Sequence, residues 1–269
     1  MTLRVVSLNA WGGKLHAPLM RYLANVEADI FCLQEIVRTP AAHSDWLEYR
    51  DGEHILPQRT HLFEEIQAIL PHHDGMFSPT ARGELFDGAG TVPSEFGLAT
   101  FVRASLPIIG QAMDFIHGAF SPHGWGPHPR GRNAHGVRLY SYDGDFPVTV
   151  FQLHGLRDRN GKGDTPARAA QAEALLRLIE RLWHRGERLI VCGDLNLLPD
   201  SNTFEVLSRL GLVDLVTSRG FTSTRTSHYE KDGRFADYML VTPNVEVVRF
   251  DVVAEPEVSD HCALRLDFR

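Results

Sequence analysis

Apolar residues along the chain gather in short runs, and several of these runs are followed directly by acids, amides or histidines. The β-branched and aromatic runs predict strands at residues 3–8, 29–34, 96–103, 136–141, 147–153, 188–193, 236–241, 245–252 and 262–268. Apolar positions at helical spacing predict helices at residues 16–27, 59–70, 165–184 and 201–210. The helix at 165–184 has the clearest start, because Thr165 suits an N-cap and Pro166 suits the first helical position.

The order of these elements indicates the fold class. Strands outnumber helices, and several consecutive strands have no helix between them. This pattern favours an α+β or layered α/β sandwich over a doubly wound parallel sheet. Segment 104–135, rich in glycine, proline, histidine and arginine, predicts a long loop, and segment 38–58 predicts a weaker one. Because no linker divides the chain, we expect a single domain over residues 1–269.

Composition narrows the classes of ligand and the compartment. The chain has 269 residues and a formal net charge of −7, whereas nucleic-acid binders usually carry a basic surface. Nucleic acid therefore stays open as a partner without being indicated by charge. The three cysteines lie in or beside apolar runs, which is typical of a reducing compartment. With no leader pattern and no apolar run long enough for a membrane span, we expect a cytoplasmic protein.

Polar groups recur at the ends of the predicted strands. Four apolar runs are followed by such groups, namely Asn9, Glu35, His154 and Asp194 with Asn196, and a fifth run is preceded by the triplet Ser259-Asp260-His261. Any one of them alone is commonly a turn residue or a helix cap. Glu35 is harder to explain in that way, because an unpaired carboxylate at the end of an apolar run is costly. The joint pattern predicts that these ends converge on one rim that a ligand can reach.

The residue types predict a hard-metal site next to a phosphate. Asn9, Glu35 and Asp260 offer oxygen ligands, which suit Mg²⁺ or Mn²⁺ better than Zn²⁺. The remaining groups predict proton transfer and phosphate binding. We expect Asp194 to orient or deprotonate a water, Asp237 to polarise His261, and Asn196 and His154 to donate to phosphoryl oxygens.

Six segments resemble, in order, the motifs of the endonuclease/exonuclease/phosphatase superfamily, also called DNase I-like. They are SLNAWGG, CLQEI, FQLHG, VCGDLN, FADYML and VSDH, and they span residues 7 to 261. The resemblance implies a four-layered α/β sandwich, with two packed, mainly antiparallel sheets flanked by helices. It also implies a hydrolase of phosphate esters that depends on a divalent metal.

The resemblance implies a role for each matching position. Glu35 is expected to ligate the metal, with Asn9 and Asp260 nearby. Asp194 is expected to position the attacking water, and Asn196 to hold the phosphate. His261, paired with Asp237, is expected to stabilise the phosphorane-like state or to transfer a proton, and His154 to contact the phosphate as in the DNase-like members. The metal is expected to act as Lewis acid and charge clamp in an in-line displacement.

Departures from the motifs count against assigning the chain to two branches of the superfamily. Leu198 stands where inositol 5-phosphatases have an arginine, and Tyr238 stands where they have the arginine of an Asp-Arg pair. Trp11 follows Ala10, so that the first motif lacks the second polar residue of the abasic-site endonucleases. The stretch LHGLRDRNGKGDTPARAAQ resembles a common bacterial branch of uncharacterised hydrolases. We expect a phosphodiesterase, with a phosphomonoesterase and a catalytically silent binding protein as the alternatives.

Further residues are weaker candidates for contact with the substrate. They are Trp11, Arg130, Arg132, Asn133, His135 and Arg157. For the loop residues, an ordinary solvated loop is an equally good explanation. The sequence leaves open the substrate, the number of metal ions and the oligomeric state.

Overall fold

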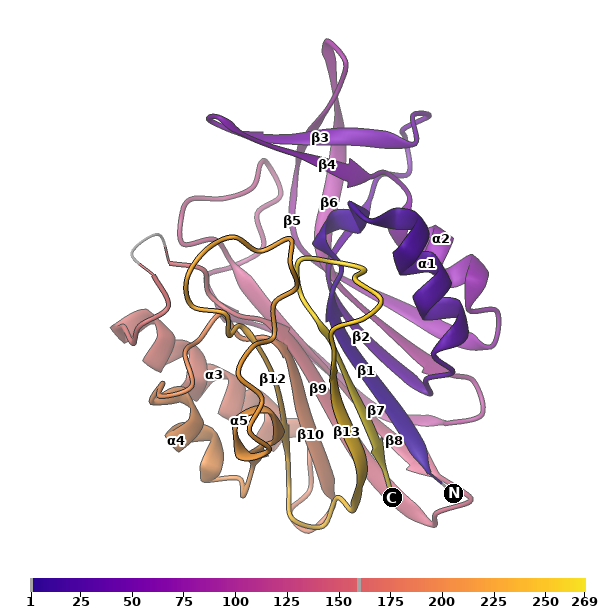
Figure 1. Ribbon diagram of the computed structural model, residues 1–269, viewed down its shortest axis with the longest axis vertical. Coiled ribbons are helices and arrows are strands. Elements are labelled where there is room, and N and C mark those ends of the chain that lie inside the picture. Colours follow the sequence, from indigo (N-terminus) through magenta and orange to yellow (C-terminus); the bar gives the residue numbers. More distant parts are fainter. Residues whose placement is uncertain (1, 159–160) are drawn as a thin grey trace.

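Two β-sheets lie face to face in the computed structural model, which describes residues 2–158 and 161–269 (Figure 1). The first sheet contains, in spatial order, β13 (Val247–Val253), β14 (Ala263–Phe268), β1 (Leu3–Asn9), β2 (Ile30–Arg38), β6 (Gly90–Arg103), β5 (His73–Asp87), β3 (Trp46–Asp51) and β4 (His54–Arg59). The second contains β11 (Val213–Asp214), β12 (Asp237–Val241), β10 (Arg188–Asp194), β9 (Phe146–His154), β8 (Arg132–Ser141) and β7 (Ile108–His117).

Helices cover the outer faces of both sheets. The helices are α1 (His16–Asn25) and α2 (Leu62–Ile69) on the first sheet, and α3 (Pro166–Leu182), α4 (Thr203–Ser208) and α5 (Leu215–Ser218) on the second. A short 3₁₀ turn, η1 (Trp11–Gly13), follows β1. One apolar core packs α1 and α2 on the first sheet, and a larger core joins the two sheets and α3. The expected four-layered α/β sandwich is therefore confirmed.

Two parallel strand pairs determine where the site forms. β1 pairs in parallel with β2, and β9 pairs in parallel with β10. α1 connects the first pair and α3 the second, as parallel neighbours require a crossover. The carboxyl ends of all four strands lie at the end of the sandwich opposite the two chain termini (Figure 1).

The predicted loop at 104–135 is wrong over much of its length. Residues 108–117 form β7 and residues 132–135 begin β8, so that only residues 104–107 and 118–131 of the predicted loop lie outside these strands. β7 is an edge strand with alternating exposed and half-buried positions, and only Ile116 in it is fully buried. A strand of this kind lacks the continuous apolar run from which strands were predicted.

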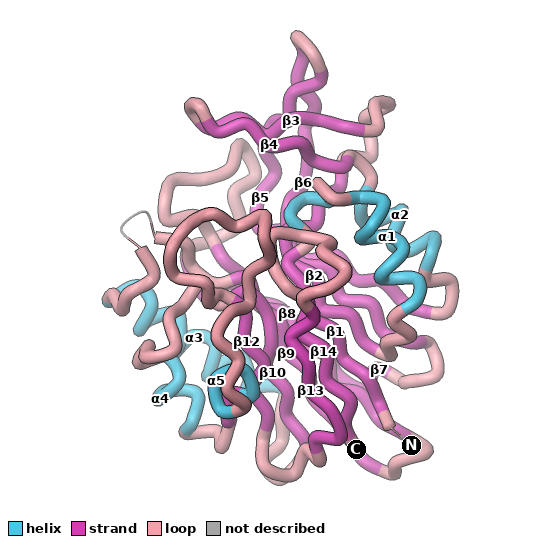
Figure 2. The backbone as a smooth tube through the Cα atoms, viewed as in Figure 1, coloured by secondary structure: helices cyan, strands magenta, loops and turns pink. Residues whose placement is uncertain are grey.

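The segment between the predicted strands 29–34 and 96–103 also contains more strand residues than expected. The weak loop at 38–58 contains β3 and most of β4, and β5 was not predicted at all. β5 contains Gly75, Pro79 and Gly83, residues that usually mark turns. Pro79 coincides with an irregularity in the pairing of β5 with β6. The β3–β4 hairpin and the tips of β5 and β6 project beyond the sandwich (Figure 2).

Candidate active site

Strand register brings four of the predicted residues to neighbouring positions. His154 and Asp194 are the last residues of β9 and β10 and lie directly opposite each other. Asp237 begins β12 and pairs with Asp194 from the other side, because β12 runs antiparallel to β10. Asn9 ends β1 in the other sheet, and it donates from Nδ2 to Asp194 Oδ2 at 3.0 Å. The candidate site therefore spans the gap between the two sheets.

Glu35 reaches this cluster because β2 is irregular at that point. The pairing of β2 with β6 shifts between Leu33 and Ile36, and Glu35 has a φ of 57°, in the left-handed region. Such a bulge redirects one side chain out of the regular alternation. The Glu35 carboxylate accepts a hydrogen bond from Asn9 Nδ2 at 3.0 Å, and its side chain is 25% exposed. It is thus the most accessible of the acids at the centre of the site.

Asp194 is held at both oxygens. Oδ2 accepts from Asn9, and Oδ1 accepts from the backbone N–H of Asn196 at 3.0 Å. Burial alone would raise the pKa of Asp194, but the charges of His261 and Arg225 hold it well below its usual value. Asp194 is therefore a fixed carboxylate at neutral pH, with an orientation that does not depend on a ligand.

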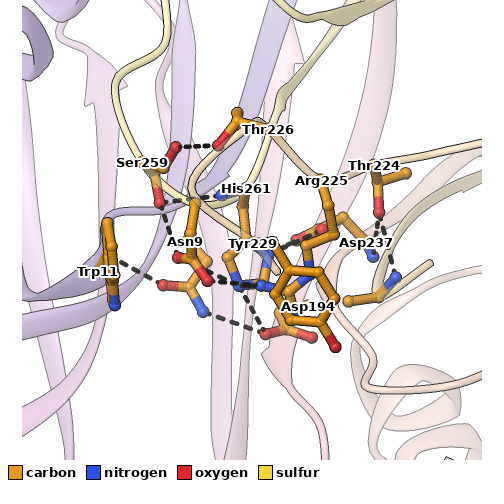
Figure 3. Close-up of polar contacts among 12 residues, drawn as sticks. Asn9, Trp11, Asp194, Thr224, Arg225, Thr226, Tyr229, Asp237, Ser259 and His261 are labelled. Carbon is orange, nitrogen blue, oxygen red and sulfur yellow. Dashed lines mark hydrogen bonds and ion pairs between the residues drawn. The ribbon is translucent and has the colours of Figure 1, made fainter. Parts of the chain in front are cut away.

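His261 and Asp237 form a close pair. His261 Nδ1 lies 2.9 Å and 2.8 Å from the two oxygens of Asp237, and both residues are buried (Figure 3). The second ring nitrogen, Nε2, lies 3.7 Å from Asp194 Oδ2. Burial lowers the pKa of His261, but the carboxylates of Asp237 and Asp194 raise it by more, so that the net pKa is above its usual value. The pair is suited to hold or accept a proton.

His154 lies between Glu35 of the first sheet and Asp194 of the second. Its Nε2 is 3.9 Å from Glu35 Oε1 and 3.7 Å from Asp194 Oδ2. Burial, together with the nearby charge of Arg132, holds the pKa of His154 well below its usual value. The ring is therefore neutral at pH 7 and can donate one N–H to a ligand.

The donor set around Glu35 fits a hard cation. Burial raises the pKa of Glu35, the hydrogen bond from Asn9 lowers it, and the charge of Asp260 raises it again, which leaves it above its usual value. A carboxylate in such surroundings gains from a nearby positive charge. A second group, formed by Asp194, Asp237 and His261, places one ligand atom of each residue within 4.8 Å of the others. The structure thus has two candidate positions for positive charge.

The weaker candidates have different environments. Arg132 is buried, its pKa is lowered to about 10 by burial, and the charges of Glu35 and Asp194 act on it. Arg157 is exposed and close enough to affect the pKa of His154. Trp11 is half-buried, and its backbone N–H donates to Asn9 Oδ1 at 3.0 Å. These three therefore lie at or beside the cluster.

The other loop candidates contact structural partners instead. Arg130 donates to the Tyr49 hydroxyl at 2.6 Å, on the β3 hairpin. Asn133 is fully buried and donates to the backbone oxygen of Ser78 at 3.1 Å, so that it exposes no atom to a substrate. His135 is buried too, with Nδ1 at 2.6 Å from the Thr100 hydroxyl. The side chains of Asn133 and His135 point into the sandwich.

Sequence reasoning missed Arg225. Its guanidinium is buried and donates from Nη1 to Asp260 Oδ2 at 2.9 Å and to His261 Nε2 at 2.5 Å. It lies in the polar segment STRTSHYEKDGR, which has the composition of a solvated loop. An isolated bridge between Arg225 and His261, far apart in sequence, places it in the site. No local pattern indicates that bridge.

Comparisons with solved structures agree with the fold. A search of curated protein sequences finds no match. Among solved structures, an endonuclease/exonuclease/phosphatase family protein from Bacteroides thetaiotaomicron superposes with a TM-score of 0.69 at 17% identity, covering 100% of this chain and 97% of that one. A mannosyl-6-phosphatase from the same species gives 0.69 at 16%, covering 99% of each chain. TDP2 from D. rerio, complexed with a single-stranded DNA product, gives 0.66 at 15%, covering 100% and 99%.

Two further findings bear on the class of protein. Within residues 2–158 and 161–269, no helix combines the length and the apolar character needed to cross a membrane. The family model described as Endonuclease/Exonuclease/phosphatase family matches residues 6–261. That range includes every residue of the cluster, from Asn9 to His261. The chain therefore belongs to the endonuclease/exonuclease/phosphatase family, whose members are hydrolases that act on phosphoester bonds.

Proposed function

We propose that this protein is a divalent-metal-dependent phosphoesterase that hydrolyses a phosphodiester by in-line attack of water. One observation carries the proposal. Asn9 and Glu35 come from one sheet, and His154, Asp194 and Asp237 come from the other, yet their side chains meet at one end of the sandwich. Acids, amides and neutral imidazole at one point are the groups that metal-assisted hydrolysis of a phosphate ester requires.

Glu35 is the residue that would hold the metal, with Asn9 and Asp260 beside it. Its side chain is partly exposed, and its raised pKa reflects burial and acidic neighbours that a cation would compensate. Oxygen donors without thiolates favour Mg²⁺ or Mn²⁺. When bound there, such an ion would polarise a phosphoryl oxygen and neutralise developing charge.

Asp194 would orient the attacking water. Both of its oxygens have fixed partners, and its low pKa keeps it ionised, so that it offers a rigid acceptor for the O–H of a water. A low pKa makes it a weak base, and orientation is therefore its main contribution. His261, oriented by Asp237, would stabilise the charged transition state or transfer a proton.

The phosphate would be bound by donors that surround the acids. His154 is neutral and can donate one N–H, and Asn196 is fixed beside Asp194 with its Nδ2 at 3.3 Å from Gly155 O. Arg132 adds a positive charge near the carboxylates of Glu35 and Asp194. Arg157 and Trp11 would contact the substrate outside the reacting group, since both are accessible at the edge of the cluster.

The proposal also specifies the type of phosphate ester, a diester or a monoester. The neighbours of similar fold include a mannosyl-6-phosphatase, which is named for a monoester, and TDP2 with a DNA product. The net charge of −7 does not favour long nucleic acids as substrates. We propose a diester with a small or short-chain leaving group, and a phosphomonoester of a small molecule is the alternative.

The test is hydrolysis of bis(p-nitrophenyl) phosphate and p-nitrophenyl phosphate, side by side, with Mg²⁺, with Mn²⁺ and with EDTA. We expect cleavage of the diester with either metal and none with EDTA. Cleavage of the monoester alone would contradict the diester preference. Equal turnover in EDTA would contradict the metal dependence. If neither compound is cleaved, Mn²⁺ binding measured by calorimetry separates a selective enzyme from a chain without a metal site.

A further inference from the structure

A buried arginine lies inside the acidic part of the site. The side chain of Arg225 is 6% exposed, and its Nη1 donates to both Asp260 and His261. The charges of Asp194 and Asp237 also act on it. This part of the site therefore contains its own cation, which none of the six sequence motifs includes.

Arg225 uses the atom of His261 that a metal would need. A guanidinium can only donate, so His261 Nε2 accepts from it, and His261 Nδ1 carries the proton that points to Asp237. Nε2 has one lone pair, and a metal ion would lie at about 2.0–2.2 Å along it. Nη1 is hydrogen-bonded to Nε2 at 2.5 Å and therefore competes for that lone pair. The group of Asp194, Asp237 and His261 cannot use all three of its ligand atoms while Arg225 is in place.

The position of Arg225 is fixed by its surroundings. Its guanidinium carbon lies 4.3 Å from the centre of the Tyr229 ring, which is a cation–π contact (Figure 3). The backbone on either side is tied to the segment before β14, because Thr226 N donates to Asp260 O at 3.2 Å and Cys262 N donates to Thr224 O at 2.9 Å. Removing a buried guanidinium from its carboxylates would leave charges unpaired.

Glu35 has a different environment. Among the residues that the structure describes, no arginine or lysine forms an ion pair with it, and its one hydrogen bond comes from Asn9. His154 Nε2 lies 3.9 Å from Glu35 Oε1, beyond hydrogen-bond distance. The two candidate positions for positive charge thus differ. At one of them Arg225 is hydrogen-bonded to the site, whereas the charge of Arg132 acts on Glu35 without an ion pair or hydrogen bond among the described residues.

We propose that Arg225 serves as a permanent cation beside Asp260 and His261 and thereby limits the site to one divalent ion, held at Glu35. The inference rests on the proposed function, because it takes Glu35 as the metal ligand. It assigns Arg225 a role in determining how many ions bind. It also predicts that replacing Arg225 with a neutral residue opens a second position at Asp194, Asp237 and His261.

The test is Mn²⁺ binding to metal-stripped protein, measured by calorimetry and by electron paramagnetic resonance. We expect one ion per chain for the wild type and for Arg225→Lys, which keeps a positive charge, and two for Arg225→Met. In the double variant Arg225→Met/Asp237→Asn, the second ion is lost again. Two ions in the wild type, or one ion in a folded Arg225→Met variant, would overturn the inference.

A second comparison keeps the inference testable if Arg225→Met does not fold. In the wild-type background, Glu35→Gln should weaken Mn²⁺ binding more than 10-fold, within the range for loss of a group at a metal site. Asp237→Asn should change it less than twofold. Equal weakening by both variants would overturn the inference and leave the proposed function standing. A wild type that binds no Mn²⁺ would overturn both.

Discussion

Three residues at the site have positive φ although none of them is glycine. Trp11, Glu35 and Asn196 have φ values of 52°, 57° and 55°. Such backbone costs on the order of 1–3 kcal/mol for a side chain that does not favour it, and it persists where the surroundings impose it. At two of these positions hydrogen bonds hold the backbone, since Trp11 N donates to Asn9 Oδ1 and Asn196 N donates to Asp194 Oδ1. Local strain at these points sets the direction of the functional side chains.

His135 shows how a polar residue near the site can be purely structural. It is 1% exposed, and burial lowers its pKa to about 4. Its two nitrogens contact Thr100 Oγ1 at 2.6 Å and Gln111 Nε2 at 2.9 Å. The ring is therefore kept neutral in the folded protein, whereas in the unfolded chain it titrates near 6.5.

This difference predicts a pH dependence of stability. Because the folded pKa of His135 is depressed, its contribution is complete above about pH 6.5 and is lost as the pH falls towards 4. The full loss is on the order of 3 kcal/mol in the free energy of unfolding. Urea unfolding at several pH values should show that the free energy of unfolding declines less for His135→Gln than for the wild type as the pH falls. Parallel curves for the two proteins would contradict this assignment.

At the scale of elements, strands formed by continuous apolar runs were predictable, and strands with an interrupted apolar pattern were not. The ranges predicted for the β1, β9, β10 and β14 strands agree with the structure to within one residue at each end. These strands are nearly continuous apolar runs because both faces are covered. β5 and β7 each pair with the next strand along the chain, but they carry glycine, proline or exposed polar positions. Such positions interrupt the apolar run from which a strand is predicted.

The end of β10 depends on close contact with β9. Gly193 has a φ of 136°, and a Cβ at that position would lie 2.1 Å from the backbone oxygen of Leu153. Only glycine allows the two strands to approach so closely just before Asp194 and His154.

We expect Gly193→Ala to lower the free energy of unfolding by about 1–3 kcal/mol and to reduce hydrolysis, because it displaces Asp194. Gly163→Ala is the matched control, since a Cβ there meets nothing within 4 Å. Thermal unfolding and turnover are to be measured on both variants. A Gly193→Ala protein as stable and active as the control would show that this strand contact is not required.

At the scale of the whole molecule, the site depends on how the two sheets dock. Buried amides link the sheets behind the site, where Gln34 Nε2 donates to Gln152 Oε1 at 2.9 Å. Asn9 makes the corresponding link at the site, joining Glu35 of the first sheet to Asp194 of the second. A carboxylate on one sheet is thus positioned by the other, which is why the cluster requires the complete sandwich.

The sequence indicated the strand-end residues of the site and the pairing of His261 with Asp237, but not the contacts from more distant segments. Asn9, Glu35, His154, Asp194, Asp237 and His261 were all named from motif and strand position, and the structure places them together. Arg225 was missed and Asn133 was placed in a loop, because both depend on contacts between distant segments. Motifs encode residues at strand ends, whereas the charge balance of the site arises only when the loops fold over them.

The central claim is that Glu35 and a divalent metal together support hydrolysis of a phosphodiester. The most direct measurement is the Mn²⁺-dependent turnover of bis(p-nitrophenyl) phosphate by Glu35→Gln, with the exposed Glu53→Gln as the matched control and thermal unfolding as a check of the fold. Our account predicts that Glu35→Gln folds normally and loses on the order of 100-fold or more in turnover, while the control keeps wild-type turnover. A folded Glu35→Gln protein that turns over at the wild-type rate would contradict it.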